Sequence, residues 1–479
     1  MAGITEMRLR RSLATSTVAV LSIWTASCAA LGSNYERPEL APPPAYRFTA
    51  APDQAQSLAD APWFQIFDDP VLQALVKEAL SGGNLDLRIA VARVEEARAR
   101  AGIARSFLYP EVNATGGYGV RGASTTDDQD EGSTSQAGNL GFRLSWEIDL
   151  FGRLRRERDA ATAIALATEQ ARRGVIVTLI GDIASNYFLL RELDLQLLIA
   201  RETLRLNDET VLYFRNRLEG GVANRLELDR IQANRARTAA AIPDIEQRIA
   251  LVENLLSFLL GRPPGALPRD ALRPDEVLPP AIPPGLPAQL LERRPDVMQA
   301  EQLLVAANAN VGAARAAFYP TISLTGFLGG VSNDLTQFLG GTGGVWSLGA
   351  NLFQPIFQGG RLRRNLEAQQ ARFEGALSEY RRAALNAYRE VSDSLVTIQK
   401  LAEQRAQWQE GVTALTDAAA LARERYDSGL ASYIEILTAD EELFAQQLLL
   451  TQTQGAEMRA RASLYRALGG GWQPEPGQP

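Results

Sequence analysis

Apolar and polar residues alternate strictly in one stretch of the chain, between positions 138 and 152. The alternation is carried by six apolar side chains: Leu140, Phe142, Leu144, Trp146, Ile148 and Leu150. Alternation over about 11 residues predicts a strand with one apolar face, and this length is typical of a strand that crosses a bilayer at a tilt. Strands of soluble sandwiches alternate too, but they are usually nearer 5–6 residues. We therefore expect a membrane-type strand here.

The pattern becomes helical directly after this strand. From Arg153 to about Leu218 there is no proline, and about 65 residues of helix at 1.5 Å per residue span ~98 Å. Gly221 predicts a tight turn, and Asn224 predicts the cap of a return helix that ends near Leu260. The expected unit is a long strand followed by a long helix pair over about 153–260.

Two helices and a second strand are expected before this unit. Asp69 opens a short helix, and Asn84 caps another that runs to about Tyr109. A weakly alternating segment from 111 to 122 is separated from the first strand by a polar segment. Together they predict a long β-hairpin over about 111–150.

The same order of elements returns in the second half of the chain. ARAGIARSFLYPEVNATGGYG, residues 99–119, aligns with ANVGAARAAFYPTISLTGFLG, residues 309–329, and FGRLRR at 151–156 aligns with GGRLRR at 359–364. We therefore expect two internal repeats. The first covers 63–287 and ends in a proline-rich crossing, and the second covers 288–470, with a hairpin at about 321–357 and a helix pair at about 361–468.

The N-terminal part of the chain carries an export signal. Residues 1–27 combine arginines, a short apolar run and small residues, which predicts a cleaved signal peptide. The only cysteine, Cys28, follows directly and is similar to the acylated cysteine of bacterial lipoproteins, although Thr25 stands where that motif has Leu or Val. An unpaired thiol is the alternative. Ala29 then favours sorting to the outer membrane, residues 28–62 form an extended linker, and 471–479 form a tail.

Composition argues against several classes of function. The formal net charge is −7, which does not favour nucleic acid as a partner. The chain has no histidine and one cysteine, so the commonest general base and the usual zinc ligands are missing. We expect no cofactor, no metal site and no catalytic residues. An enzyme that works with carboxylates alone is the remaining alternative of this class, and no motif places one.

The four predicted strands constrain the oligomeric state. Four strands cannot close a barrel, and open sheet edges do not survive in lipid. The strands must therefore be shared between subunits: a dimer would give eight, and a homotrimer gives 12 with room for a channel. The expected fold class is an α+β membrane protein, a trimeric 12-stranded β-barrel that continues into a long α-helical barrel.

Several segments also resemble a known family. They are PWFQIFDDPVLQALVKEAL (62–80), NLDLRIAVARVEEARA (84–99), RRPDVMQAEQLLVAANANVGAA (293–314), FYPTISLTG (318–326) and RYDSGLASYIEILTADEEL (425–443). The chain resembles the outer-membrane factor family, the TolC-like exit ducts of efflux pumps and type I secretion systems, and in particular its OprM-like and NodT-like lipoproteins. Together with the repeat, these segments cover nearly the whole chain after the signal peptide.

The resemblance implies a barrel in the outer membrane and a helical barrel of ~100 Å in the periplasm. It also implies that the turns at Gly221 and Gly429 form a periplasmic tip that docks on an adaptor protein and closes as an iris. The docking candidates are Gly221, Val222, Asn224, Gly429, Leu430 and Ser432. The gate candidates are Arg225, Leu226, Asp229, Tyr433, Ile434, Glu435 and Asp440.

The charges of the gate depart from the family pattern. OprM-like members have an acidic residue at the position of Thr438, and here the nearest carboxylate on that side is Asp440, with Glu435 and Asp229 as alternatives. Among the aromatic residues, Trp146 and Trp346 are the candidates for the membrane interface. Glu147 and Asp149 are expected on the inner strand face, where they would favour cations.

Two groups of basic residues begin the long helices. They are Arg153, Arg155 and Arg156, and Arg361, Arg363 and Arg364. Basic residues at a helix N-terminus oppose the helix dipole. Contact with lipid head groups or with acidic partners is therefore the hypothesis for both groups.

The function expected from these features is that of a passive exit duct in a tripartite efflux system. The chain contains no G-x-x-x-x-G-K-[ST] motif, so energy has to come from an inner-membrane transporter that is joined through the adaptor. The cargo is expected to be small molecules. The alternatives are a type I secretion duct and a periplasmic lipoprotein rod without a pore.

Overall fold

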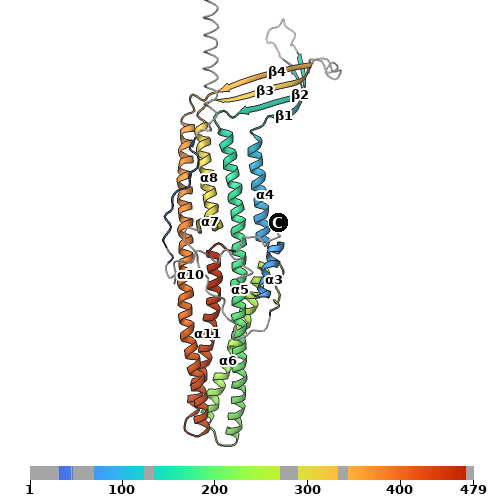
Figure 1. Ribbon diagram of the computed structural model, residues 1–479. Coiled ribbons are helices and arrows are strands. Elements are labelled where there is room, and N and C mark those ends of the chain that lie inside the picture. Colours follow the sequence, from blue (N-terminus) through green and yellow to red (C-terminus); the bar gives the residue numbers. More distant parts are fainter. Residues whose placement is uncertain are drawn as a thin grey trace, which may run out of the picture. The chain divides into compact units, whose positions relative to one another are not determined.

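The computed structural model describes residues 32–44, 46, 69–122, 134–269, 290–332 and 344–470 (Figure 1). The expected signal peptide, Cys28, most of the linker and the tail lie outside the described residues. The chain divides into two compact units. Unit 1 comprises Met1–Glu39, Arg93–Thr168 and Gln299–Tyr380, and unit 2 comprises Leu40–Ala92, Glu169–Met298 and Arg381–Pro479.

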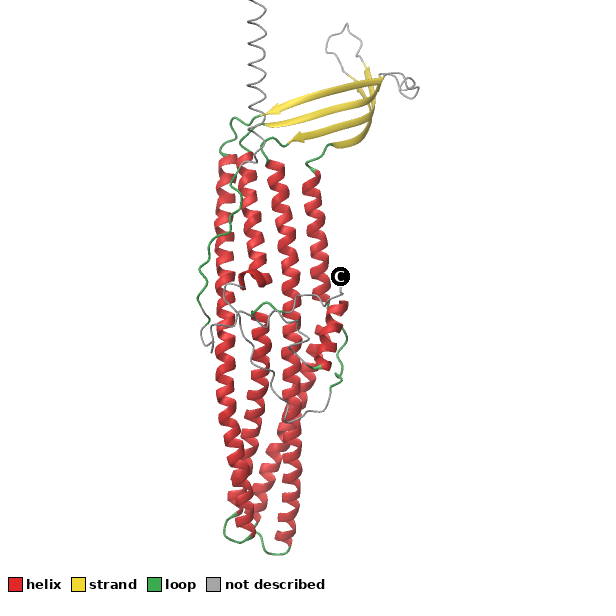
Figure 2. Cartoon of the chain, in the orientation of Figure 1, coloured by secondary structure: helices red, strands yellow, loops and turns green. Residues whose placement is uncertain are grey.

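The described chain is mostly helical with a few strands (Figure 2). The elements are α3 (Pro70–Glu78), η2 (Ala79–Gly83), α4 (Leu85–Ser106), β1 (Glu111–Gly122), β2 (Thr134–Ile148), α5 (Arg153–Glu219), α6 (Arg225–Leu259), α7 (Leu290–Arg293), α8 (Pro295–Ala316), β3 (Thr321–Ser332), β4 (Gly344–Phe353), α10 (Arg361–Asp427) and α11 (Tyr433–Ala467). The series α4-β1-β2-α5-α6 and α8-β3-β4-α10-α11 have the same order. In both, the three helices are 22, 67 and 35 residues long.

The strands of unit 1 form one antiparallel sheet in the order β1-β2-β3-β4. Phe142 lies opposite both Ala114 and Leu328, and Leu328 lies opposite Trp346. Because directly paired residues share a face, this register collects the alternating apolar side chains of the four strands on one face. Many of them are exposed, as are the outer edges of β1 and β4 within the described sheet. A face of this kind has to be covered by something other than the chain itself.

Two strands end earlier than the alternation predicted. β2 ends at Ile148 because the carboxylate of Asp149 caps the next helix, where it accepts hydrogen bonds from the N–H groups of Leu154 (3.2 Å) and Arg155 (2.8 Å). β4 ends at Phe353, two residues before Pro355, which cannot donate to a strand ladder.

The carboxylates of Glu147 and Asp149 are also not free to attract cations. Both oxygens of Glu147 accept from Arg153 at 2.8 Å, and Asp149 accepts from Arg155 at 3.2 Å. The charge of each carboxylate is therefore neutralised within the chain. The expectation that these two residues favour cations on the inner face is not supported by this pairing.

The segment that follows the expected lipidation site is held on unit 1. Arg156 donates to the carbonyl oxygen of Gly32 (3.0 Å), Asn308 donates to that of Ser33 (3.2 Å), and Arg37 pairs with Glu301 at 2.9 Å. These contacts join residues 32–37 to α5 and α8. Cys28 precedes this attached segment by four residues in the sequence.

Unit 2 is fixed by buried polar contacts between helices. Asn84 caps α4 by accepting from the N–H of Leu87 (2.8 Å), and it donates to the carbonyl oxygen of Leu259 (2.8 Å). The fully buried carboxylate of Glu457 pairs with Arg405 at 2.9 Å and with Arg461 at 2.6 Å. These pairs tie α10 to α11 and leave that carboxylate compensated.

Two glycines bring β2 and β3 unusually close together. Gly141 and Gly329 are directly paired, and a Cβ atom added to Gly141 would lie 2.5 Å from the carbonyl oxygen of Leu328 and 2.9 Å from the ring of Phe327. The ring of Phe327 lies equally close to the position of a Cβ on Gly329. This aromatic side chain therefore covers both glycines.

Gly141→Ala is expected to lower the thermal stability of the purified protein, because the backbone has no room for the methyl group. Overpacking of this kind costs about 1–3 kcal/mol. Gly119→Ala is the matched control, since a Cβ there meets nothing within 4 Å. Equal unfolding temperatures of the two variants, measured in the same detergent, would contradict the close packing of β2 and β3.

Candidate functional site at the helix turns

The two long helix pairs end in turns of the same construction. Gly221 and Gly429 have φ angles of 72° and 73°, in the left-handed region that favours glycine. The N–H of Val222 donates to the carbonyl oxygen of Arg217 (2.9 Å), and the N–H of Leu430 donates to that of Arg425 (2.8 Å). Both are Schellman caps, which place Val222 and Leu430 at equivalent, exposed positions. We call these turns with their flanking helix ends, residues 208–236 and 419–441 of unit 2, the tip.

The return helices start differently. At α6 the side chain of Asn224 accepts from the N–H of Glu227 (2.9 Å), while Glu227 accepts from the N–H of Asn224 (3.4 Å), which completes a capping box. At α11 the side chain of Ser432 makes no capping hydrogen bond. The start of α11 is thus less firmly capped than that of α6.

A small apolar core holds the four helices of the tip together. Its buried members are Phe214, Leu228, Ile231, Ala422, Tyr433 and Ile436. The ring of Phe214 in α5 lies 4.3 Å from that of Tyr433 in α11, measured between centroids. Tyr433 is only 8% exposed, and burial raises the pKa of its hydroxyl. Tyr433 is therefore a packing residue, unlike the other gate candidates.

The apolar gate candidates face away from this core. Leu226 is 61% exposed and Ile434 is 46% exposed. They follow the two turns at equivalent positions, five residues after Gly221 and Gly429. An exposed apolar side chain is free to pack against the same residue of another copy of the chain. Several copies could therefore close a pore at this position.

Each acidic gate candidate lies beside an arginine. Asp229 pairs with Arg225 at 3.1 Å within the first turns of α6, and Glu435 lies 3.9 Å from Arg425. Asp440 pairs with Arg423 at 2.5 Å and so links α11 to α10. Burial raises the pKa of Asp440, while the charge of Arg423 opposes this shift.

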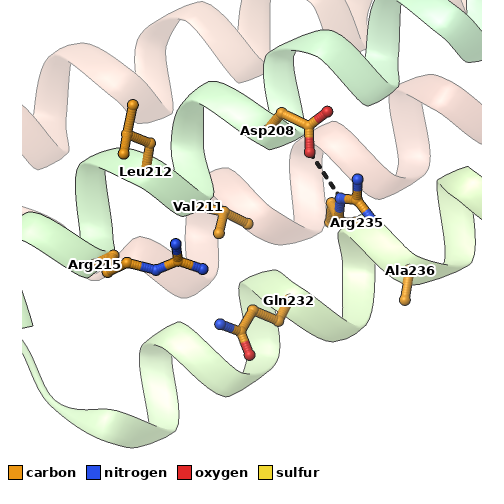
Figure 3. Close-up of a pocket in the computed structure, with 7 residues that line it drawn as sticks. All are labelled: Asp208, Val211, Leu212, Arg215, Gln232, Arg235 and Ala236. Carbon is orange, nitrogen blue, oxygen red and sulfur yellow. Dashed lines mark hydrogen bonds and ion pairs between the residues drawn. The ribbon is translucent and has the colours of Figure 1, made fainter.

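A hollow of about 420 Å³ lies between α5 and α6 beside the first turn (Figure 3). Its lining residues are Asp208, Val211, Leu212, Arg215, Gln232, Arg235 and Ala236. Asp208 and Arg235 close one end of it with an ion pair of 2.7 Å. Sequence reasoning missed this surface. The sequence could have predicted it from the spacing of three and four residues, which places 208, 211, 212 and 215 on one face of a helix and 232, 235 and 236 on one face of the next.

The two tryptophan candidates share the apolar face of the sheet. Trp146 lies opposite Leu324 and donates to the carbonyl oxygen of Leu108 (3.1 Å), whereas Trp346 lies opposite Leu328 and is 76% exposed. The partners of the two tryptophans in β3, Leu324 and Leu328, are four residues apart. The tryptophans are therefore separated by roughly 13 Å along the strand direction. Because an apolar band is ~25 Å tall, the two side chains are too close to mark its two borders.

No group of three or more His, Cys, Asp or Glu side chains within the described ranges is arranged to hold a metal ion.

Comparison with known proteins gives consistent matches over most of the chain. The profile of the family described as "Outer membrane efflux protein" matches residues 75–262 and 286–470. The chain is 34% identical to the probable outer membrane lipoprotein SilC of Salmonella typhimurium over 463 residues, 96% of this chain and 98% of that protein. It is 34% identical to the cation efflux system protein CusC of Escherichia coli K12 over 444 residues, 92% of this chain and 96% of that protein.

A solved structure has the same fold. The open state of the Neisseria gonorrhoeae MtrE outer membrane channel is similar with a TM-score of 0.85 and 28% identity, over 93% of this chain and 99% of that one. The order of helices and strands described above extends through both matched regions of the family profile. The chain belongs to the outer membrane efflux protein family.

Proposed function

We propose that this chain is the subunit of a trimeric exit duct in a tripartite efflux system, anchored in the outer membrane and extending into the periplasm. The observation that carries the proposal is the sheet: its apolar face is exposed, its two edges are unpaired within the described strands, and each hairpin leads into a helix of 67 residues. Three copies joined at these edges supply 12 strands around a pore. The two series of elements would be internal repeats that contribute equally to this barrel.

The lipid anchor fits the same arrangement. Acylation of Cys28 would place acyl chains near residues 32–37, which are hydrogen-bonded to α5 and α8 close to the sheet. The relative SilC is named as a lipoprotein. The anchor and the barrel would then lie in the same membrane.

The tip is the proposed docking and gating region. Exposed Val222 and Leu430, the turn glycines and the hollow between α5 and α6 offer a periplasmic adaptor an apolar surface edged by charges. Leu226 and Ile434 would close the pore in the resting state. An adaptor that binds the dilated tip more tightly than the closed tip opens it by that difference in affinity, and an inner-membrane transporter supplies the energy.

The cargo is proposed to be small molecules. Relatives with the same 34% identity are named for cation efflux and for toluene efflux, which is consistent with one kind of duct serving different pumps. A type I secretion duct and a rod without a lumen remain the competing functions. Conductance in a planar lipid bilayer separates the rod from the duct.

The variant Leu226→Ser/Ile434→Ser is expected to conduct more than the parent protein in a planar lipid bilayer. Removing two apolar side chains from each subunit loosens the proposed constriction, so small and flickering openings should become large and steady. Leu251→Ser/Leu385→Ser, at exposed positions of α6 and α10 outside the tip, is the matched control and should behave as the parent. No conductance from any inserted trimer would favour the rod.

Asp440→Asn is expected to become more stabilising as the pH rises. The pKa of Asp440 is raised above its unfolded value, about 3.9, so its favourable contribution is complete below that value and is lost as the pH rises through the folded-state pKa. The difference in unfolding temperature between the variant and the parent should therefore grow from pH 3.5 to pH 7. A constant or shrinking difference would refute this, and Asp229→Asn controls for loss of one carboxylate at the tip.

A further inference from the structure

The same five residues, GRLRR, begin both of the longest helices. The first segment is Gly152–Arg156, at the start of α5, and the second is Gly360–Arg364, at the start of α10. In both copies the glycine has a left-handed backbone, with φ of 81° and 85°. The two segments have the same sequence and the same glycine conformation. They can therefore be compared by the acidic and apolar side chains that lie around each of them.

The first copy is neutralised by the chain. Over residues 147–159 there are four acidic and four basic residues. Asp149 accepts from the N–H of Leu154 and from both the N–H and the Nε of Arg155, and Glu147 accepts from Arg153. Its helix N-terminus and its arginines thus share carboxylates that offset both the dipole and the basic charge.

The second copy lacks these carboxylates. Over the equivalent residues 355–367 there are three arginines and one acid, Glu367, which Arg363 and Arg364 share. The side chains of Arg363 and Arg364 are 82% exposed. The guanidinium of Arg361 donates to the neutral amide oxygen of Gln358, at 2.6 Å and 3.1 Å, and no ion pair of Arg361 is found within the described residues. A net positive charge therefore remains at this site.

Apolar side chains replace the missing acids. The position that corresponds to Asp149 is Phe357, and Phe357 and its neighbour Ile356 are each 88% exposed. They follow the end of β4, on which Leu352 is also exposed. Exposed apolar residues directly followed by arginines are the arrangement of a segment that lies at a lipid surface.

We propose that Arg361, Arg363 and Arg364 bind the phosphate of an anionic phospholipid whose acyl chains lie on Ile356, Phe357 and Leu352. The guanidinium groups would supply the bidentate phosphate contacts for which arginine is suited, in place of the carboxylates of the first copy. The arginines that begin α5 bind no lipid, because Glu147 and Asp149 occupy Arg153 and Arg155, and the buried Arg156 donates to Gly32 and Asn34. The hypothesis drawn from the sequence for all six arginines is thus confined to the second group.

The test is the composition of the lipid bound to the protein. After partial delipidation, parent protein reconstituted in nanodiscs of phosphatidylethanolamine and phosphatidylglycerol at 4:1 should retain lipid in which the ratio of phosphatidylglycerol to phosphatidylethanolamine is about five times that of the bulk. This is the factor expected for one basic contact at a membrane surface. Mass spectrometry of the retained lipid measures it. The triple variant Arg361→Gln/Arg363→Gln/Arg364→Gln should retain lipid of bulk composition.

Two further variants separate a site from general attraction by charge. Arg381→Gln/Arg389→Gln/Lys400→Gln removes the same number of exposed charges further along α10 and should keep the enrichment. Ile356→Ser/Phe357→Ser keeps every charge and should lower it. The Arg→Lys triple variant, expected to give intermediate enrichment, decides the matter if the Gln variant does not assemble.

Several results would overturn the proposal. They are bulk composition around the parent protein, undiminished enrichment in the Arg361, Arg363 and Arg364 variants, or equal loss in the Arg381, Arg389 and Lys400 control. Thermal stabilisation by inorganic phosphate equal to that by phosphatidylglycerol would assign the arginines to a free anion instead. All of these outcomes are independent of whether the trimer conducts.

Discussion

An antiparallel sheet with two open edges and one exposed apolar face cannot be stable by itself, and the rest of this protein depends on how that constraint is met. Unpaired N–H and C=O groups cost several kcal/mol each in a lipid environment, so the outer edges of β1 and β4 require partners. In the proposed trimer, closure by further copies of the same chain would satisfy the edges, and lipid would cover the apolar face. The 67-residue helices that follow each hairpin would then repeat around the same axis.

The gate that we propose at the helix turns has the opposite requirement, because a gate has to be stable in more than one arrangement. Within one chain the tip combines a buried core, centred on the rings of Phe214 and Tyr433, with exposed apolar residues after each turn. The core can keep the helices of one subunit together while the exposed residues change partners between subunits. The weaker cap of α11 suggests that the second helix pair is the more adaptable one.

Periodic features of this chain were predictable from sequence, and features that depend on particular neighbours were not. The long helices, the turns at Gly221 and Gly429 and the cap at Asn224 follow from proline-free helical patterns, glycine and short polar side chains. Alternation placed the strands but overran the end of β2, because it does not show that Asp149 bonds the backbone of α5. Likewise, spacing from the turn made Tyr433 equivalent to Arg225, and only packing shows that its side chain is buried.

The central claim is that three copies close one barrel through the edges of β1 and β4. The most direct measurement is disulfide crosslinking of membranes that contain chains with one cysteine on β1, such as Asn113→Cys, and one on β4, scanned over positions 347–351. At the correct register, oxidation should yield a covalent species of three chains and nothing larger, because the ring is closed. Crosslinks confined to two chains, an open ladder of larger species, or none at any register would contradict the account.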